Sequence, residues 1–599
     1  MNPPFLRPLL AASLLAAVTL PRAETAVLRT ESGSPPLHWN FDQYLAEYFP
    51  DQNPDTRAIR FHLGTTVSRF GTQSNEWNSV RAAFAQWQAI PNTKIRFEEA
   101  APITAPSNLS ALDGRNDIVW LSPGTYGQGD LGERISLTSG TIALTVLALD
   151  FDFDGNSTGT IVEADTVINR GLNFTTDYGS LSSSEIFLES SLLHEIGHWL
   201  GMNHSPLGAA TLWWYSGNGV GAGAGLSSDD ISFARSTYGQ TAALQADGVV
   251  SGTVTSGGNA VSGALISVEQ TNGIVVAGTI TEPNGTFRIP GIPAGSYRLR
   301  AYPCDPNTGG DNSLVRGLEL DVSAARRFAG ANTAFRPFLD SSFDLPAGGS
   351  VQRTLAVTAG NPPFRITEVR IGFNSTGRAS GDQPLLLPAG ATNLWVGVFV
   401  PGAVASNALL RVTGPGITHG PTEVIRPALR QLTLVQCRVD VSADAAPGMR
   451  SIEVTADGHT ASAVGFVDVD PRAPDHNSDG LNDRFQRRYF APWTGANAAP
   501  EADPDNDGFV NRREEAMGSD PTDRQSVAYR LTRIRMTLSG TEVTWESAPG
   551  RRYQLWRRET LSTPWLAVGS PVVAVGETST LTDGTPASTE RFYRITEIP

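Results

Sequence analysis

The stretch His194-Glu195-Ile196-Gly197-His198-Trp199-Leu200-Gly201-Met202-Asn203-His204 follows the pattern HExxHxxGxxH, and it constrains the fold more than any other part of the chain. On a helix, His194 and His198 are four residues apart and therefore lie on one face. That spacing suits two of the three protein ligands of a catalytic zinc ion. Gly201 permits the left-handed turn that ends such a helix. We expect this turn to bring His204 round as the third ligand.

Glu195 lies beside the first histidine and is not expected to bind the metal. Its carboxylate can accept a proton from a metal-activated water and later pass it to the leaving amine. Two alternatives are a buried helix that merely contains histidines and a degenerate zinc site that folds without activity. Because the fixed positions rarely coincide by chance at average composition, the pattern predicts one catalytic zinc ion on His194, His198 and His204, with Glu195 as the general base.

The motif resembles that of the metzincin metallopeptidases, and the flanking sequence is similar to the matrixin-like branch over roughly residues 36–240. The resemblance implies an α+β catalytic domain with a mixed twisted sheet and long helices. It also implies a zinc endopeptidase that acts on a protein or peptide substrate. The similar segments are the first helix at residues 79–87, strands at 95–97 and 116–118, the strand that lines the active-site cleft at 159–165, and the final helix at 226–231 with Tyr238 and Gly239 after it.

Matrixins carry a methionine turn beneath the zinc, and the corresponding position here falls near Leu212. Leucine and methionine have similar volumes, so this exchange can keep the apolar floor. Trp213, Trp214 and Tyr215 follow, where the family builds the pocket for the residue after the cleaved bond. We interpret Leu212 to Tyr215 as a candidate substrate pocket for a bulky apolar side chain. The alternative is that the two tryptophans pack the core.

Cys304 and Cys437 are the only cysteines. They could form one disulfide in an oxidising compartment, or stay as two separate thiols. Since no cysteine precedes Cys304, we do not expect the N-terminal cysteine latency of many animal matrixins. His38 and His62 are the only histidines before His194, so the additional structural zinc of those enzymes is not expected either.

The length of 599 residues predicts several domains. Residues 1–23 read as a secretory signal, with Arg7, an apolar run and a plausible cleavage point at Ala23. The apolar run is too short for a membrane span. We therefore expect a secreted protein, extracellular or, in a bacterium, periplasmic or at the cell surface. The net charge of −15 argues against a nucleic-acid partner.

Beyond about residue 245, apolar and polar residues alternate in short runs between Gly, Pro and Asn turns, which is typical of β-sheet. Residues 246–303 resemble a carboxypeptidase-regulatory-like β-sandwich. Residues 310–470 predict one or two further Ig-like sandwiches, and residues 526–599 predict a C-terminal sandwich module. Whether these domains are spacers or bind a cell-surface or matrix ligand stays open.

Residues 471–525 contain two acidic loops. The second loop has oxygen-bearing residues at positions 1, 3, 5, 9 and 12, and glycine at position 6, as in an EF-hand calcium loop. Its candidate ligands are Asp503, Asp505, Asp507, Phe509, Asn511 and Glu514. The first loop offers Asp475, Asn477, Asp479 and Asp483, but Gln486 stands where the bidentate glutamate belongs. We expect this loop to bind calcium more weakly or to share a site.

Paired loops of this kind resemble dockerin or thrombospondin type 3 segments, which implies structural calcium. The alternative is a solvated, Asp-rich linker. Within the peptidase region, Asp150, Asp152 and Asp154 open a similar acidic turn, but Ile161 occupies its twelfth position. This turn could bind a calcium ion beside the cleft or be an exposed hairpin.

The sequence thus predicts a multidomain chain: an α+β metzincin domain, several all-β sandwich domains and a short calcium-loop segment. The expected activity is that of a secreted zinc endopeptidase. The alternative is a calcium-stabilised extracellular adhesion or surface-binding protein with an inactive peptidase-like domain. Because His194, Glu195, His198 and His204 are all present, the enzyme is favoured.

Overall fold

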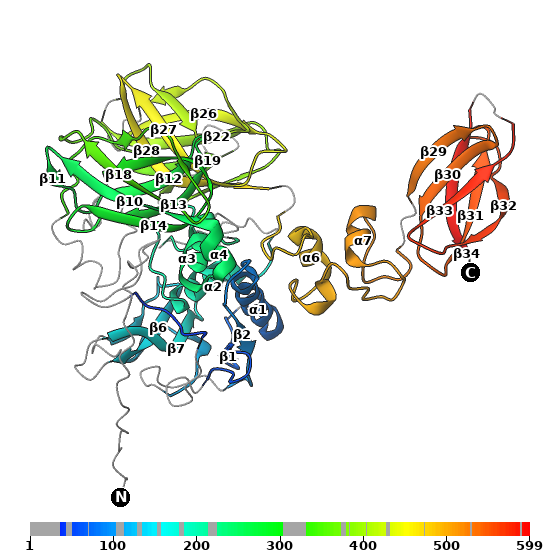
Figure 1. The fold of residues 1–599 in the computed structure, drawn as a ribbon, viewed down its shortest axis with the longest axis horizontal. Helices are drawn as coiled ribbons and strands as arrows, with labels where there is room; N and C mark the ends of the chain where they lie inside the picture. Colours follow the sequence, from blue (N-terminus) through cyan, green and yellow to red (C-terminus); the bar gives the residue numbers. More distant parts are fainter. Residues whose placement is uncertain are drawn as a thin grey trace, which may run out of the picture.

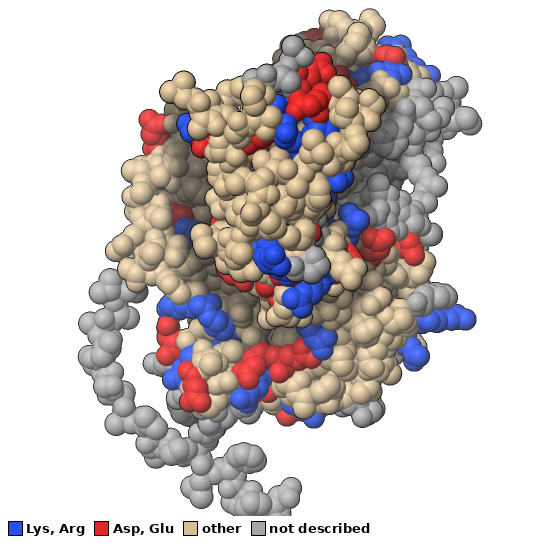
Figure 2. Space-filling model, turned by 90° about the vertical axis from the view of Figure 1, so that its right-hand side faces the viewer, with Lys and Arg blue, Asp and Glu red and all other residues tan. Residues whose placement is uncertain are grey.

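The computed structural model describes residues 36–42, 51–69, 71–103, 113–128, 134–151, 157–178, 185–213, 224–303, 331–372, 379–381, 384–402, 404–426, 432–471, 474–526, 530–586 and 590–598. No helix in these ranges is long and apolar enough to cross a membrane. On the face shown in Figure 2, acidic and basic side chains lie in small mixed groups among uncharged residues.

The N-terminal domain is built on a five-stranded sheet of order β2-β1-β3-β7-β6, with α1 and α2 packed together beside it (Figure 1). Strands β2, β1, β3 and β7 are parallel, and β6 pairs antiparallel with β7. This is the mixed sheet with long helices that the sequence predicts. The elements are β1 Ile59–Leu63, α1 Gln73–Ala89, β2 Phe97–Glu99, β3 Asp117–Leu121, β4 Gly124–Gln128, β5 Arg134–Leu137, β6 Ala143–Phe151, β7 Ser157–Asn169, β8 Phe174–Thr175, β9 Ile186–Phe187, α2 Leu188–Trp199, α3 Ser228–Tyr238 and α4 Thr241–Ala246.

Residues 159–165, predicted to line the active-site cleft, lie in β7, an inner strand between β3 and β6. Both β7 and its outer neighbour β6 contact α2. The sequences of the two strands do not show which one lies at the edge of the sheet.

The two long helices pack through large side chains spaced to face one another. The rings of Phe84 in α1 and Trp199 in α2 pack edge to face, with 5.3 Å between their centroids. The indole N–H of Trp87 donates to the Leu193 carbonyl at 3.0 Å. Helix α2 ends where Gly201 takes a φ of +86°, which confirms the predicted left-handed turn. A Cβ at Gly201 would lie 2.2 Å from the Leu37 carbonyl oxygen, so close approach also demands glycine there.

The first β-sandwich is longer than the predicted residues 246–303. Strand β18 pairs in parallel with β10, and β16 and β17 pair with β15. Phe335, Leu345, Leu355 and Val357 are buried in the same core as the earlier strands, so these late strands complete the sandwich. Its strands are β10 Asp247–Ser256, β11 Asn259–Ala260, β12 Leu265–Gln270, β13 Val275–Ile280, β14 Thr286–Pro293, β15 Gly295–Tyr302, β16 Phe338–Leu339, β17 Phe343–Leu345 and β18 Ser350–Val357.

The second sandwich shares a sheet with the first, because β13 pairs with β27 at Val275 and Met449. A six-stranded sheet around β22 and β26 forms its other layer, and side chains of both layers meet in one core. The strands are β19 Glu368–Gly372, β20 Ala379–Gly381, β21 Leu385–Pro388, β22 Leu394–Pro401, β23 Leu409–Val412, β24 Ile417–His419, β25 Glu423–Ile425, β26 Leu432–Val441, β27 Gly448–Ala456 and β28 His459–Asp470.

The loop that follows His204 is buried between the peptidase domain and both sandwiches. Leu207 belongs to a core cluster that also contains Val275 of β13 and Val464 of β28. Beside it, the fully buried carboxylate of Asp229 accepts hydrogen bonds from the Ser205 hydroxyl at 2.6 Å and from the Gly278 amide at 2.9 Å. Side chains from all three modules therefore pack together in one buried cluster.

The chain then leaves the second sandwich through α6 Asp483–Tyr489, the short helix η2 Ala496–Ala498 and α7 Asn511–Met517, and ends in a separate module (Figure 1). That module consists of two three-stranded sheets whose buried side chains form one core, as predicted for a C-terminal sandwich. Its strands are β29 Leu531–Thr537, β30 Gly540–Glu546, β31 Arg552–Arg558, β32 Leu566–Val573, β33 Thr578–Asp583 and β34 Phe592–Ile598.

Helix α6 docks onto the first turn of α2 through a buried ion pair. The Arg487 guanidinium donates to both carboxylate oxygens of Glu189 at 2.6 and 2.8 Å, and their side chains are 10% and 3% exposed. The same carboxylate accepts from Gln86 of α1 and from the indole of Trp493. The Arg487 guanidinium also lies 4.1 Å from the Trp493 ring centroid, a cation–π contact.

Buried carboxylates gather where the start of β3 meets the middle of β7. Burial raises the pKa of Asp117 to about 6, of Glu163 to about 7 and of Asp165 to about 8. Backbone N–H donors to Glu163 and Asp165 oppose these shifts only in part. Unfolded carboxyl groups titrate near pH 4, so the folded domain holds these protons to a higher pH than the unfolded chain does.

Replacing Arg487 by methionine should destabilise the docked structure, because Glu189 would stay buried without its cation. We expect a loss of about 3–5 kcal/mol in denaturant unfolding of the full chain followed by tryptophan fluorescence. Arg488→Met is the matched control, since Arg488 is exposed and lies over the neighbouring Tyr489 ring. It should change stability by less than about 0.5 kcal/mol. Equal losses in the two variants would contradict the role of the ion pair.

The buried carboxylates predict a pH dependence with a definite sign. Their pKa values are raised on folding, so stability should fall as the pH rises from about 4 to about 8. Asp165→Asn should reduce the drop in melting temperature between pH 5.5 and pH 8, because the amide cannot lose that proton. Asp55→Asn, an exposed control, should leave the drop unchanged. If the melting temperature of Asp165→Asn fell between pH 5.5 and pH 8 as far as that of the wild type, Asp165 would not be a source of the pH dependence.

Candidate metal centre

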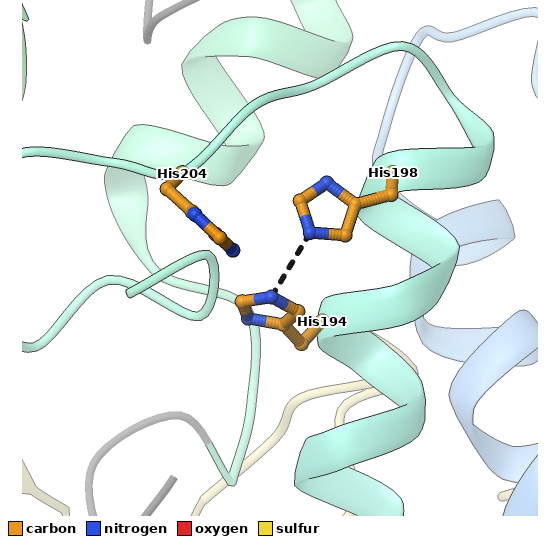
Figure 3. Close-up of side chains that lie close together, drawn as sticks. All are labelled: His194, His198 and His204. Carbon is orange, nitrogen blue, oxygen red and sulfur yellow. Dashed lines mark hydrogen bonds between the residues drawn. The ribbon is translucent and has the colours of Figure 1, made fainter. Parts of the chain in front are cut away.

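Three histidine side chains converge on one point, His194 and His198 from α2 and His204 from the following loop (Figure 3). Their ring centroids are 4.7 to 5.1 Å apart, and one ring nitrogen of each lies within 4.8 Å of the others. All three side chains are partly exposed. The group is therefore accessible from solvent.

Hydrogen bonds to backbone carbonyls determine which nitrogens face the centre. The Nδ1 atom of His194 donates to the Thr211 carbonyl at 2.9 Å, and that of His198 donates to the Met202 carbonyl at 2.8 Å, because a carbonyl oxygen only accepts. Each Nε2 atom consequently bears a lone pair, and the two Nε2 atoms lie 3.0 Å apart. A cation shared between the two Nε2 atoms, either a proton or a metal ion, removes the repulsion of their lone pairs, and three imidazole nitrogens in one group fit a metal such as zinc.

A series of hydrogen bonds connects His194 to α3 through Thr211. Thr211, whose carbonyl holds the His194 ring, donates its own N–H to the Asp230 carboxylate at 3.2 Å. Asp230 also accepts from the Ser227 backbone and hydroxyl in a capping box that begins α3. Burial lowers the pKa of His194 to about 4. The ring is thus neutral at physiological pH, the form that binds a metal.

Glu195 follows the first histidine and is 7% exposed. Its Oε2 atom accepts a hydrogen bond from the Thr145 hydroxyl of β6 at 2.6 Å. Burial raises the Glu195 pKa to about 7, although the hydrogen bond from Thr145 lowers it. A carboxylate with a pKa near neutrality can both accept and release a proton. Thr145 lies in an apolar strand with no spacing signal, so the sequence did not identify it.

The candidate pocket residues separate into two groups. Leu212 is fully buried beneath α2, where a Cβ on Gly197 would meet its side chain at 2.5 Å, so it forms an apolar floor. Trp213 packs edge to face on Phe466 of β28, 5.1 Å between ring centroids, within the core of the second sandwich. This placement favours the packing alternative for Trp213. Trp214 and Tyr215 lie outside the described residues.

The two acidic loops have the same local structure. In each, the carboxylate at position 1, Asp475 or Asp503, accepts from the backbone N–H groups of positions 5 and 6 at 3.0 to 3.1 Å. The sixth residue is a glycine with positive φ, Gly480 at +86° and Gly508 at +94°. A short helix, α6 or α7, begins at position 9 in each copy. The loops are therefore two copies of one loop–helix unit.

The second loop encloses oxygen atoms without hydrogen-bond partners. One carboxylate oxygen from each of Asp503, Asp505 and Asp507 lies within 4.8 Å of the others. Among the described residues, the buried oxygens without a partner include Asp505 Oδ2, Asp507 Oδ2, Asn511 Oδ1 and Glu514 Oε2. These four atoms come from positions 3, 5, 9 and 12, and Glu514 is fully buried. Burial first, then these aspartates, raise the Glu514 pKa to about 8.

In the first loop an amide takes the place of that glutamate. Gln486 Nε2 donates to the Ala498 carbonyl at 3.0 Å and to Asp479 Oδ2 at 2.6 Å. Asn477 Nδ2 donates to the same Asp479 oxygen at 2.8 Å. Because the Ala498 carbonyl only accepts, the orientation of the Gln486 amide is fixed with its N–H toward Asp479. Asp483 pairs with His476.

Of the acidic turn in the peptidase domain, Asp150 accepts a hydrogen bond from the Thr158 hydroxyl at 3.0 Å. Asp152 and Asp154 lie outside the described residues, as do residues 1–23 and Cys304. Cys437 is fully buried in β26.

Comparisons with known proteins identify two families within the chain. Residues 55–239 match the family model described as Matrixin, and residues 249–310 match the Carboxypeptidase regulatory-like domain. A comparison with curated proteins gives no match. A solved structure of BcpA, the major pilin subunit of Bacillus cereus, is 12% identical over 38% of this chain and 70% of that chain, with a TM-score of 0.14. A variant of that subunit is 10% identical over 59% and 88%, with a TM-score of 0.13. The chain therefore contains a matrixin domain of metallopeptidase type, followed by a carboxypeptidase regulatory-like domain.

Proposed function

We propose that this protein is a secreted zinc endopeptidase in which His194, His198 and His204 hold the metal. The observation that supports this most directly is the convergence of three histidines, with the Nε2 atoms of His194 and His198 3.0 Å apart. The match to the matrixin family supports a protein substrate. The signal-like pattern of residues 1–23 supports secretion.

Zinc bound to these histidines would polarise the scissile carbonyl and make the attacking water more acidic. Glu195 would accept the proton of that water on its carboxylate. It would then return the proton to the leaving amine as the peptide bond breaks. The backbone carbonyls of Thr211 and Met202 keep the two helical histidines in the metal-binding tautomer throughout.

The test is Glu195→Gln in the full chain, because the site loop is packed against the sandwiches. The variant should retain about one equivalent of zinc by mass spectrometry, while peptide hydrolysis falls by about 10² to 10⁴. Glu185→Gln, a partly exposed carboxylate before the same helix, serves as the control and should keep full activity. Zinc binding without cleavage in the wild type would instead favour the inactive, surface-binding alternative.

We also propose that one calcium ion binds the second acidic loop, on Asp503, Asp505, Asp507, Glu514 and the Phe509 carbonyl, with Asn511 at the ninth position. The buried oxygens without partners at four of these positions support it, since calcium prefers several carboxylate and carbonyl oxygens. For the first loop we propose that no calcium binds. There, Asn477 Oδ1 and Asp483 Oδ1 are also buried without a hydrogen-bond partner. However, the N–H groups of Gln486 and Asn477 already donate to the Asp479 carboxylate that would face the ion.

Glu514→Gln should remove one calcium equivalent from the full chain, measured by titration calorimetry after chelation, because it deletes the bidentate carboxylate. Glu501→Gln alters an exposed carboxylate of the same segment and should leave the count unchanged. A count that is the same in Glu514→Gln and wild type would refute this site. A loss of one equivalent in Gln486→Ala would refute the assignment of the first loop.

A further inference from the structure

Three buried hydrogen bonds connect the end of α2 to the carboxylate of Glu195 by way of the sheet. The indole N–H of Trp199 donates to the Thr166 hydroxyl of β7 at 2.7 Å. The hydroxyls of Thr166 and Thr145 lie 2.9 Å apart, and Thr145 donates to Glu195 Oε2 at 2.6 Å. Thr166 is 1% exposed and Thr145 is 6% exposed. Water therefore does not compete for these groups.

The two ends of this series fix the direction of every bond in it. The Trp199 indole is a donor only, so Thr166 receives a hydrogen at its oxygen. An ionised Glu195 carboxylate is an acceptor only. The single hydroxyl hydrogen of Thr145 goes to this carboxylate at 2.6 Å rather than to the Glu195 backbone carbonyl, which lies 3.3 Å away. Thr166 must then donate its own hydrogen to Thr145. With Glu195 ionised, each hydroxyl has one donor and one acceptor role filled, which leaves a single arrangement of hydrogens.

We propose that Thr145 is a positioning residue for peptide hydrolysis. Its hydroxyl holds one carboxylate oxygen of Glu195, so that the other oxygen is turned toward the attacking water. The inference rests on the proposed role of Glu195 as general base. A carboxylate that can rotate freely spends only part of its time in the productive orientation. A fixed hydrogen bond keeps it in that orientation.

Packing alone does not explain a hydroxyl at this position. Valine has nearly the shape of threonine and would fill the same buried space on β6, while lacking the donor. The hydrogen bond to an ionised carboxylate is of the stronger kind, short and charge-assisted. Two substitutions can therefore separate the hydroxyl from the methyl group: Thr145→Val keeps the volume, and Thr145→Ser keeps the donor.

The first measurement is steady-state hydrolysis of one peptide by full-length wild type, Thr145→Val and Thr145→Ser. Thr145→Val should lower kcat by about tenfold to a hundredfold with KM close to wild type. Thr145→Ser should restore most of kcat, because it retains the donor. Unchanged kcat in Thr145→Val would overturn the proposal. An equal loss in Thr145→Ser would also overturn it, since packing would then be the cause.

A second measurement does not need turnover. A hydroxamic acid gives up a proton when it binds a metal, and a neighbouring carboxylate can accept that proton. The dissociation constant of acetohydroxamic acid on the zinc-loaded chain should rise in Thr145→Val and return toward wild type in Thr145→Ser, with zinc content equal in all three. Identical constants would overturn the role of Thr145. Wild-type binding with no cleavage of any peptide would reject the proposed function instead, while this comparison would still decide the role of Thr145.

Discussion

The burial of the loop after His204 is the constraint on which the rest of the structure depends. Leu207 and its apolar neighbours cannot be covered by the peptidase domain alone, and both sandwiches contribute side chains to enclose them. Asp229 adds a polar connection, because its buried carboxylate joins Ser205 of this loop to Gly278 of the first sandwich. The geometry of the third histidine is thus set partly by domains that contain no ligand.

The same arrangement recurs around three of the four groups at the centre: the side chains of His194, His198 and Glu195 are each held by a second, buried group. Carbonyls of Thr211 and Met202 hold the two helical histidines, and Thr145 holds Glu195. Such contacts cost little in a preformed site, and they fix tautomer and orientation before any substrate arrives.

The sequence predicted those features that depend on local spacing. The four-residue separation of His194 and His198, the turn at Gly201 and the repeated acidic loops all arise within a dozen residues. The structure brings the two helical histidines together and gives the glycines of these turns a positive φ. It did not predict features that join distant segments. The completion of the first sandwich by β18, the edge position of β6 and the pairing of Arg487 with Glu189 depend on long-range packing. No periodicity within one segment encodes them.

The docking of Arg487 on Glu189 has a mechanical consequence. The C-terminal module lies at the far end of the acidic segment (Figure 1), so a pull on that module reaches α6 before it reaches the backbone that leaves the second sandwich at Asp470. The ion pair and the stacked Trp493 ring would bear that load first. Tension strong enough to release Arg487 would leave Glu189, at the start of α2, buried without its counter-charge. The Arg487 contact thus connects the acidic segment mechanically to the helix that carries His194 and His198.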